Sequence, residues 1–520
     1  MIKPIATDIY TFSELIDRGV VYVDKTDKLL DLIAGSSKQF LLARPRQFGK
    51  SLTVSTLQAI FEGRRELFKG LAIDRSDYDW KAYPVIRLDM GSCQAATLAE
   101  FREFLFKLLQ SEAARLGVTL QETTLPSVAF RRLIAEAARL SPEGQCVVLV
   151  DEYDKPLLAH LGTPSVEVIR DELKPFYGVI KYAQEFERFA FITGVSKFSK
   201  VSIFSDLNNL VDLTMDARTA TMLGYTHDEV KKYFGEHLAA LGEANGLTPE
   251  GAFDKVIAMY DGYRFEENAE RVVNPVSFGR CLSDKKFKSY WYETGTPTFL
   301  MELMKKRPMD ISNLEISEDE LGSYEPANPE IVPLLFQTGY LTIKSMDTVD
   351  DLRLYRLGFP NGGVRAAFNR SLVSAYTNVD EFRKTSAQVA CIRALQAHDL
   401  EAFFESLSVF FADIPYDLTD RQNEQAWQAI LVTLLTFVGA EVRAEERTNL
   451  GRIDAVVTCP EEIYVVEVKL DKTAAEALAQ IKGKHYHEKY LASGKRITLV
   501  GMNFSSEKRA VDDWTSEVVA

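Results

Sequence analysis

The sequence is poor in the residues that build disulfide frameworks and zinc sites, and it lacks a long apolar run. Its 520 residues include five cysteines, which are scattered without paired spacing, at positions 93, 146, 281, 391 and 459. This scatter argues against a disulfide framework or a zinc site and fits a reducing cytosol. The longest apolar stretch, 430–442, contains two threonines and is too short to cross a bilayer. We therefore expect a cytoplasmic protein that does not enter the membrane, with no signal peptide at the N-terminus.

Positive charge is also scarce. The chain has 61 Lys and Arg against 75 Asp and Glu, a formal net charge of -14. Such a chain cannot attract nucleic acid over its whole surface, so any nucleic-acid binding requires a local basic groove. A composition of 46% hydrophobic and 26% charged residues is ordinary for a soluble globular protein. The length predicts about two to four domains.

The first part of the chain alternates between segments of strand and helix character. The predicted strands are short and apolar, and each is followed by polar or turn residues: Gln39–Ala43, Pro84–Asp89, Cys146–Val150 and Phe189–Thr193. Strands without polar alternation are typical of a parallel sheet that helices cover on both faces. The sequence therefore predicts an α/β domain here.

The rest of the chain changes character several times. Thr226 and Glu229 are spaced as a capping box and predict the start of an amphipathic helix. Further on, Gly339–Ile343 and Leu352–Leu357 predict a hairpin. A helical segment from about 365 to 415 then leads to a C-terminal module.

A nucleotide-binding loop is indicated where the first predicted strand ends, in Arg44–Ser51. Backbone N–H groups of such a loop and the following helix N-terminus attract phosphate. Gly49 permits close backbone approach, Lys50 would reach the outer phosphates, and Ser51 would ligate magnesium. The segment begins with arginine where the usual pattern has glycine, and Gly-Lys-Ser alone also arises by chance.

Two acids after the third predicted strand supply the second half of this site. Asp151 would support the magnesium ion, and Glu152 would orient or deprotonate the attacking water. The alternative, that both acids only cap the next segment, is disfavoured because loop and acids occur in the right order. Thr193 or Ser196, where the fourth predicted strand ends, could sense the terminal phosphate or could form a simple turn.

A second cluster lies in the predicted hairpin Gly451–Leu470. Strand side chains alternate, so Glu467 and Lys469 share a face, and Asp454 on the paired strand can approach Glu467. Two buried carboxylates repel each other unless a cation lies between them, and oxygen ligands suit magnesium or manganese. The metal would polarise a scissile phosphate, and Lys469 could orient the water or stabilise the pentavalent phosphorus. The alternative is a surface ion-pair ladder, which the apolar neighbours of Glu467 disfavour.

Two helices flank this hairpin. Thr473 and Glu476 form a capping box that predicts a helix through Tyr486. Gln480 on that helix could face the metal site. Upstream, Glu424 could add a carboxylate, although an exposed glutamate at a helix start is the commoner case.

With these motifs the chain resembles, over nearly its full length, a bacterial family of AAA-ATPase-like proteins of the P-loop class that have a C-terminal PD-(D/E)XK nuclease-superfamily domain. The motifs that carry the resemblance are Tyr22–Thr26, Arg44–Leu52, Asp151–Pro156, Thr193–Lys197, Asp261–Phe265, Thr294–Pro297, Gln337–Leu341 and the set Asp454, Glu467 and Lys469. The resemblance implies that Arg46 and Leu52 belong to the nucleotide-binding loop. It also implies that Gln480 lies on the helix after the PD-(D/E)XK core.

The predicted fold is α/β throughout. Residues 1–220 are expected to form the P-loop AAA-like parallel sheet, and residues 221–365 a helical lid with a winged-helix-like region. Residues 366–415 are expected to form a helical connector, and residues 416–520 an α/β restriction-endonuclease-like domain.

The predicted function is ATP binding, with ATP hydrolysis, coupled to magnesium-dependent cleavage of DNA. The nuclease metal, magnesium or manganese, would be held by Asp454, Glu467 and the backbone carbonyl of Val468. Partners are ATP and DNA, and the ATPase domain offers a route to an oligomer. Two alternatives stay open: an ATP-driven switch whose C-terminal domain only grips DNA or protein, and a C-terminal domain that serves a protein partner and has no salt-dependent DNA affinity.

Overall fold

The fold comes from a computed structural model. It describes all residues except 1, 122, 199–202, 205, 206, 208, 292–297, 308, 310, 312, 313, 378, 413, 415–423, 439, 440, 449, 450, 460, 506, 509 and 520. The chain divides into two compact units: unit 1 comprises Met1–Tyr290 and Glu315–Gly363, and unit 2 comprises Trp291–Leu314 and Val364–Ala520. Within the described ranges, no helix combines the length and apolar character needed to span a bilayer.

Unit 1 is built on a five-stranded parallel sheet with the order β2-β3-β4-β1-β5. The strands are β1 (Gln39–Ala43), β2 (Val85–Asp89), β3 (Cys146–Asp151), β4 (Glu187–Gly194) and β5 (Val211–Asp212). The four predicted strands and the parallel sheet are thus confirmed, whereas the two-residue β5 was not predicted. Because β4 lies between β1 and β3, the loop after β1 and the acids after β3 meet at one edge of the sheet, separated by a single strand.

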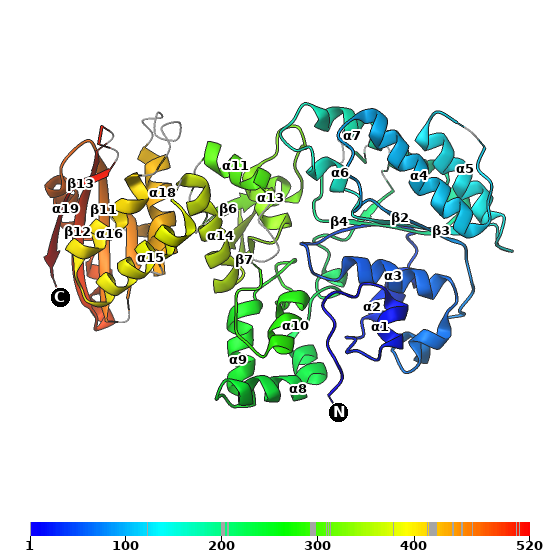
Figure 1. Ribbon diagram of the computed structural model, residues 1–520, viewed down its shortest axis with the longest axis horizontal. Helices are drawn as coiled ribbons and strands as arrows, with labels where there is room; N and C mark the ends of the chain where they lie inside the picture. Colours follow the sequence, from blue (N-terminus) through cyan, green and yellow to red (C-terminus); the bar gives the residue numbers. More distant parts are fainter. Residues whose placement is uncertain are drawn as a thin grey trace. The chain divides into compact units, whose positions relative to one another are not determined.

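Helices cover both faces of this sheet (Figure 1). One face carries α4 (Leu98–Leu116), α5 (Pro126–Ala138), α6 (Lys155–Leu158) and α7 (Ser165–Tyr182). The other face carries α1 (Phe12–Asp17), α2 (Thr26–Ala34) and α3 (Lys50–Phe61). Burial on both faces explains why every residue of β1 and β3 is buried and apolar alternation is missing.

Three helices form a separate cluster in unit 1: α8 (His227–Ala244), α9 (Pro249–Tyr260) and α10 (Pro275–Asp284). The predicted capping box at the start of α8 is confirmed. The Thr226 hydroxyl accepts the Glu229 N–H at 3.3 Å, and the Glu229 carboxylate accepts the Thr226 N–H at 2.9 Å. These helices fall within 221–365, and their role as a lid stays a prediction.

The rest of unit 1 is a small sheet with two short helices. It contains β6 (Leu314–Ser317), α12 (Glu318–Gly322), α13 (Ile331–Gln337), β7 (Thr342–Val349) and β8 (Leu352–Gly358), with the strand order β6-β8-β7. The hairpin is confirmed, but its predicted first strand, Gly339–Ile343, was wrong. Gly339 has a φ of 87° and its N–H donates to the Phe336 carbonyl, so it ends α13, and the strand begins only at Thr342.

Unit 2 joins helices to a mixed five-stranded sheet. The helices are α11 (Thr298–Lys306), α14 (Gly362–Tyr376), α15 (Glu381–Gln396), α16 (Leu400–Ala412), α18 (Glu424–Phe437) and α19 (Ala474–Gly483). The strands are β9 (Glu441–Thr448), β10 (Gly451–Thr458), β11 (Glu462–Leu470), β12 (Arg496–Ser505) and β13 (Ala510–Val518), in the order β13-β12-β11-β10-β9. β11 and β12 pair in parallel with α19 as their connection, and the other neighbouring strands pair antiparallel.

The helix predicted to run through Tyr486 ends earlier. α19 begins with the predicted Thr473–Glu476 capping box but stops at Gly483. His485 has a φ of 52°, a left-handed conformation that an α-helix does not accept. The turn carries Tyr486 back against Ile481 and Val465, where it is buried.

The structure predicts a large stability cost for Gly262→Ala. Gly262 has a φ of 107°, and a Cβ there would lie 2.1 Å from the Pro360 carbonyl oxygen. We expect the variant to lose at least about 2 kcal/mol of unfolding free energy, because backbone strain and a backbone clash add. The matched control is Gly235→Ala within α8, where a Cβ meets no atom within 4 Å. It should gain about 0.5–1 kcal/mol from helix propensity.

Urea denaturation followed by circular dichroism measures both variants. Equal stabilities for the two alanine variants would contradict the close packing of Gly262 against Pro360.

Candidate functional site

The loop between β1 and α3 closes around its lysine. Gln47 and Gly49 have φ values of 69° and 94°, so the backbone turns sharply before α3 begins at Lys50. The Lys50 ammonium donates to the carbonyl oxygens of Arg44 at 2.9 Å and Pro45 at 3.0 Å. Burial lowers the pKa of Lys50, and the carboxylates that follow β3 oppose this shift. The loop thus holds a lysine at the phosphate-binding end of a helix, near carboxylates.

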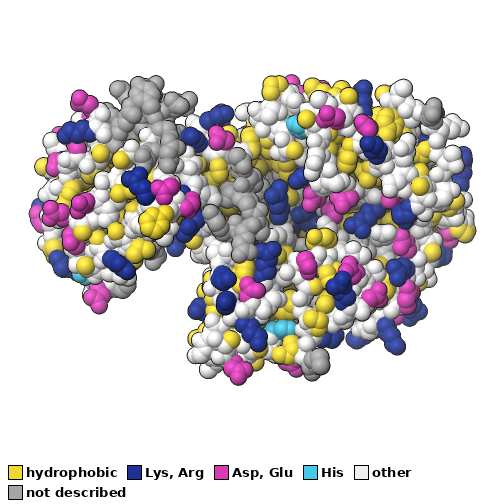
Figure 2. Space-filling view, viewed as in Figure 1, with side chains coloured by type: hydrophobic (Ala, Val, Ile, Leu, Met, Phe, Trp, Pro, Cys, Tyr) yellow, Lys and Arg dark blue, Asp and Glu magenta, His cyan; other side chains and the backbone are white. Residues whose placement is uncertain are grey.

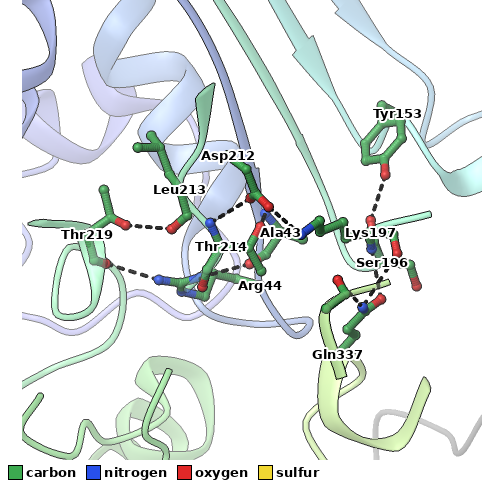
Figure 3. Close-up of polar contacts among 11 residues, drawn as sticks. Ala43, Arg44, Tyr153, Ser196, Lys197, Asp212, Leu213, Thr214, Thr219 and Gln337 are labelled. Carbon is green, nitrogen blue, oxygen red and sulfur yellow. Dashed lines mark hydrogen bonds and ion pairs between the residues drawn. The ribbon is translucent and has the colours of Figure 1, made fainter. Parts of the chain in front are cut away.

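Arg44, the first residue of the loop, is almost completely buried. Its guanidinium donates to the carbonyl oxygens of Ala43 at 2.9 Å, Thr214 at 2.6 Å and Thr219 at 3.1 Å (Figure 3). It also lies 4.2 Å from the centre of the Phe265 ring. Burial lowers the pKa of Arg44 to about 9, and Asp212 opposes the shift. Arg44, which stands where the usual loop pattern has glycine, therefore holds the loop against residues 214–219 and against Phe265.

Phe48, like Arg44, packs against Phe265. Its ring is buried and meets Tyr263 at 4.9 Å and Phe265 at 5.3 Å, both edge to face. Arg44 and Phe48 thus both contact the 261–265 motif, although more than 200 residues separate them from it in the sequence. By contrast, Arg46 is exposed and Leu52 is half-buried at the start of α3.

Carboxylates gather where β2 and β3 end. Asp151 is 1% exposed, and burial raises its pKa, while a hydrogen bond from Ser51 and the charge of Lys50 lower it. Glu152 has a φ of 50° and donates its N–H to the Asp151 carboxylate at 3.0 Å. Asp89 pairs in register with Asp151, and a Cβ on Gly91 would meet Asp89 at 2.9 Å and Glu152 at 3.0 Å. Asp89 was not predicted from the sequence.

A fourth acid, Asp154, binds the backbone where β4 ends. Its carboxylate accepts the N–H of Val195 at 3.0 Å and of Ser196 at 2.6 Å. Burial raises the pKa of Asp154 to about 6, against the Ser196 hydrogen bond and the charge of Lys50. The predicted sensor Thr193 is fully buried, and its hydroxyl donates to the Leu42 carbonyl in β1 at 2.7 Å. The motif around residues 151–156 was visible in the sequence, but the role of Asp154 was not.

A polar chain runs from this edge to α13 (Figure 3). The Thr214 N–H donates to Asp212 at 2.9 Å, and Asp212 pairs with the Lys197 ammonium at 2.5 Å. The Lys197 N–H in turn donates to the Gln337 side chain at 2.8 Å. Through Thr214, which accepts from Arg44, the phosphate loop is connected to the small sheet region that contains α13.

The second candidate site lies in unit 2, between β10 and β11. The Asp454 carboxylate accepts the Val468 N–H at 2.8 Å, and the Lys469 ammonium lies 3.2 Å from a Glu467 carboxylate oxygen. The Gln480 amide from α19 donates to that same oxygen of Glu467. The structure thus brings together Asp454, Glu467, Lys469 and Gln480. Glu424 begins α18, but its side chain lies outside the part of the chain that the structure describes.

The chemistry of Glu467 fits a divalent cation. Its carboxylate is 2% exposed, and its second oxygen, Oε2, is buried without a hydrogen-bond partner. Burial and the neighbouring Asp454 raise the pKa of Glu467 to about 7, against the charge of Lys469. Among the described residues, no three His, Cys, Asp or Glu side chains form a metal-binding group. Two carboxylates, a backbone carbonyl and water are nevertheless a sufficient set for magnesium.

Comparisons with known proteins match the two segments of the chain that contain these candidate sites. Residues 5–204 match the family described as Predicted AAA-ATPase, and residues 422–514 match the PD-(D/E)XK nuclease superfamily. An "Uncharacterized protein in vnfD 5'region" of Azotobacter chroococcum mcd 1 is 35% identical over 525 residues, covering 98% of each chain. The chain therefore belongs to the AAA-ATPase-like family and has a C-terminal domain of the PD-(D/E)XK nuclease superfamily.

Proposed function

We propose that the chain binds and hydrolyses ATP with magnesium in unit 1 and cleaves DNA with a divalent metal in its C-terminal domain. The observation that carries the nuclease proposal is the buried, unpartnered Oε2 of Glu467 next to Asp454. A domain that only gripped DNA or protein would have no physical need for a buried carboxylate oxygen without a partner, because burial of charge is costly. This favours the enzyme over the ATP-driven binding switch.

In the proposed ATP site, the backbone around Gly49 and the N-terminus of α3 bind the phosphates. Lys50 exchanges its carbonyl partners for the outer phosphates, because a charge-assisted bond to phosphate is the stronger interaction. Ser51 and Asp151 are the magnesium ligands, and when bound the ion neutralises charge on the terminal phosphates. Glu152 orients the attacking water.

The other loop positions have lesser roles in this proposal. Arg46, which is exposed, contacts the nucleotide from outside, and Leu52 belongs to the helix turn that supports Ser51. Thr193 helps to hold β4 against β1, the strand that precedes the phosphate loop, because its hydroxyl donates to the Leu42 carbonyl.

In the proposed nuclease site, Asp454, Glu467 and the carbonyl of Val468 hold magnesium or manganese. When bound, the ion polarises the scissile phosphate and lowers the pKa of a water. Lys469 orients that water or stabilises charge on the phosphorus. Gln480 orients the Glu467 carboxylate by donating to Oε1, which leaves Oε2 for the metal. Glu424 is a further candidate ligand.

We propose four functional parts with the bounds 1–220, 221–365, 366–415 and 416–520, acting in the cytoplasm. ATP binding would regulate the nuclease, because both sites belong to one chain and the phosphate loop is connected to α13 through Asp212 and Lys197. Equal cleavage rates with and without ATP would remove the basis for this regulation. Assembly into an oligomer through the ATPase part is compatible with the proposal.

The ATP proposal predicts different effects for two substitutions. Lys50→Ala should abolish ATP binding, because it removes the cation that contacts the phosphates. Glu152→Gln should bind ATP normally but hydrolyse it at least about 100-fold more slowly, because it loses the base that orients water. Calorimetric titration with ATP and phosphate release measure the two effects. The control is Glu185→Gln, an exposed glutamate before β4, which should match the unaltered chain.

Normal hydrolysis in the Glu152→Gln variant would remove this residue from the mechanism. ATP binding that survives Lys50→Ala would place the nucleotide elsewhere.

The nuclease proposal predicts that Glu467→Ala reduces cleavage of labelled DNA by more than about 100-fold with magnesium or manganese. The matched control is Glu462→Gln on the same strand. Glu462 is equally buried, but its carboxylate already accepts from Tyr464 at 3.0 Å and from Thr498 and His398. It should retain cleavage, because it has no unpartnered oxygen to offer a metal.

Single-stranded and double-stranded substrates are both assayed. Cleavage that persists in Glu467→Ala, or an equal loss in both variants, would contradict a metal site at Glu467.

A further inference from the structure

Three cations gather in unit 1 near a single buried carboxylate, where β7 begins. The Arg264 guanidinium donates to the Lys344 carbonyl at 3.4 Å, and the Lys344 ammonium donates to the Pro360 carbonyl at 3.4 Å. Arg271 approaches the Asp261 carboxylate at 3.6 Å. The Asn361 amide, next to Pro360 in the sequence, donates to the Asp261 backbone carbonyl at 2.8 Å and thus holds 360–361 close to Asp261. Arg264, Arg271 and Lys344 are called the cation cluster below.

The cation cluster is short of negative charge. The charged groups that act on Lys344 are Arg264, Arg271 and Asp261, so three cations face one carboxylate. Burial is the main cause that lowers the pKa of Lys344. The charges of Arg271 and Arg264 lower it further, and the Asp261 carboxylate opposes the shift. The cations therefore repel one another, and an added anion would relieve the repulsion.

Other cations of this region have carboxylate partners. Arg356 on β8 pairs with Glu315 at 2.9 Å, and Arg353 on the same strand pairs with Glu318 at 3.1 Å. In the cation cluster, by contrast, Arg264 Nε is buried without any hydrogen-bond partner. A buried guanidinium N–H that lacks an acceptor costs free energy, so neither an acceptor at Nε nor a carboxylate ion pair compensates the Arg264 charge among the described residues.

The cation cluster is accessible and separate from the phosphate loop. Lys344 lies at the surface with its ammonium partly buried against Pro360, and the Arg271 side chain is 53% exposed. Tyr263 and Phe265, on either side of Arg264, contact Phe48 of the loop, whereas Arg264 extends along β7 to Lys344. The Arg264 side chain therefore contacts β7 and not the phosphate loop.

We propose that the cation cluster binds the phosphodiester backbone of the DNA on which the C-terminal domain acts. This inference rests on the proposed nuclease function and adds a second DNA-binding site to it, in a different unit of the chain. Figure 2 shows Lys and Arg interspersed with Asp and Glu over the visible face. A chain with a net charge of -14 needs a local excess of cations to hold a polyanion, and the cation cluster supplies one.

The test is the salt dependence of DNA binding by the full chain. A fluorescein-labelled duplex is titrated in EDTA, which prevents cleavage, at several NaCl concentrations from about 50 to 200 mM. Removing one cation that neutralises a phosphate should reduce the slope of log affinity against log salt by about 0.9. Arg271→Gln with Lys344→Gln should therefore lower the slope by about 2 and weaken binding to all sequences alike.

The control variant is Arg353→Gln with Arg356→Gln, which removes the same formal charge from cations on β8 that carboxylates already neutralise. Its slope should equal that of the unaltered chain. ATP affinity should be the same in all three proteins. Melting temperatures are compared, and Lys344→Gln alone, with an expected slope change of about 1, serves if the double variant is less stable.

Equal slopes for the cluster and control variants would overturn this inference alone, since DNA binding itself would remain. A parallel loss of ATP affinity would overturn it by assigning the cation cluster to the nucleotide. No DNA binding by the unaltered chain would overturn both this inference and the nuclease proposal, while ATP hydrolysis could still be measured.

Discussion

The buried guanidinium of Arg44 is the interaction on which the rest of unit 1 depends. Burial of a charged group is costly, and the cost falls when its donors find acceptors. The two terminal nitrogens of Arg44 donate to three carbonyl oxygens and the Phe265 ring lies against the guanidinium, while Nε has no partner. Hydrogen bonds of this charged kind contribute about 1.5–3 kcal/mol each. Because the acceptors come from β1 and from 214–219, and the ring comes from the 261–265 motif, one side chain fixes the phosphate loop relative to both segments.

Both candidate sites contain carboxylates that lie close together near the end of a buried strand. Their charges repel one another, and burial removes the water that would stabilise them. In unit 1, the carboxylates after β3 face the ammonium of Lys50, which compensates part of their charge. In unit 2, Lys469 and Gln480 both contact Oε1 of Glu467 and leave Oε2 without a partner. In the first site a cation thus balances part of the negative charge, whereas in the second site one carboxylate oxygen has no partner and could bind a divalent cation.

The sequence predicts local features better than long-range contacts. The four principal strands, the capping boxes at Thr226 and Thr473 and the meeting of Asp454 with Glu467 follow from alternation and spacing. The strand predicted at Gly339–Ile343 was wrong, because apolar residues that end a helix look like residues that begin a strand. The pairing of Lys197 with Gln337 joins positions 140 residues apart, and no local pattern signals it. The role of Arg44 was also not predictable. Two of its acceptors lie 170 and 175 residues away in the sequence, and they are backbone carbonyls, which any residue type provides.

The most direct test of two metal-phosphate sites in one chain is a count of Mn²⁺ bound, followed by electron paramagnetic resonance, with and without a non-hydrolysable ATP analogue. Two independent classes are predicted. One binds without nucleotide and is lost in Asp454→Ala, and the other appears only with nucleotide and is lost in Asp151→Ala. A single class of bound Mn²⁺, or one that disappears in both variants together, would contradict the existence of two separate sites.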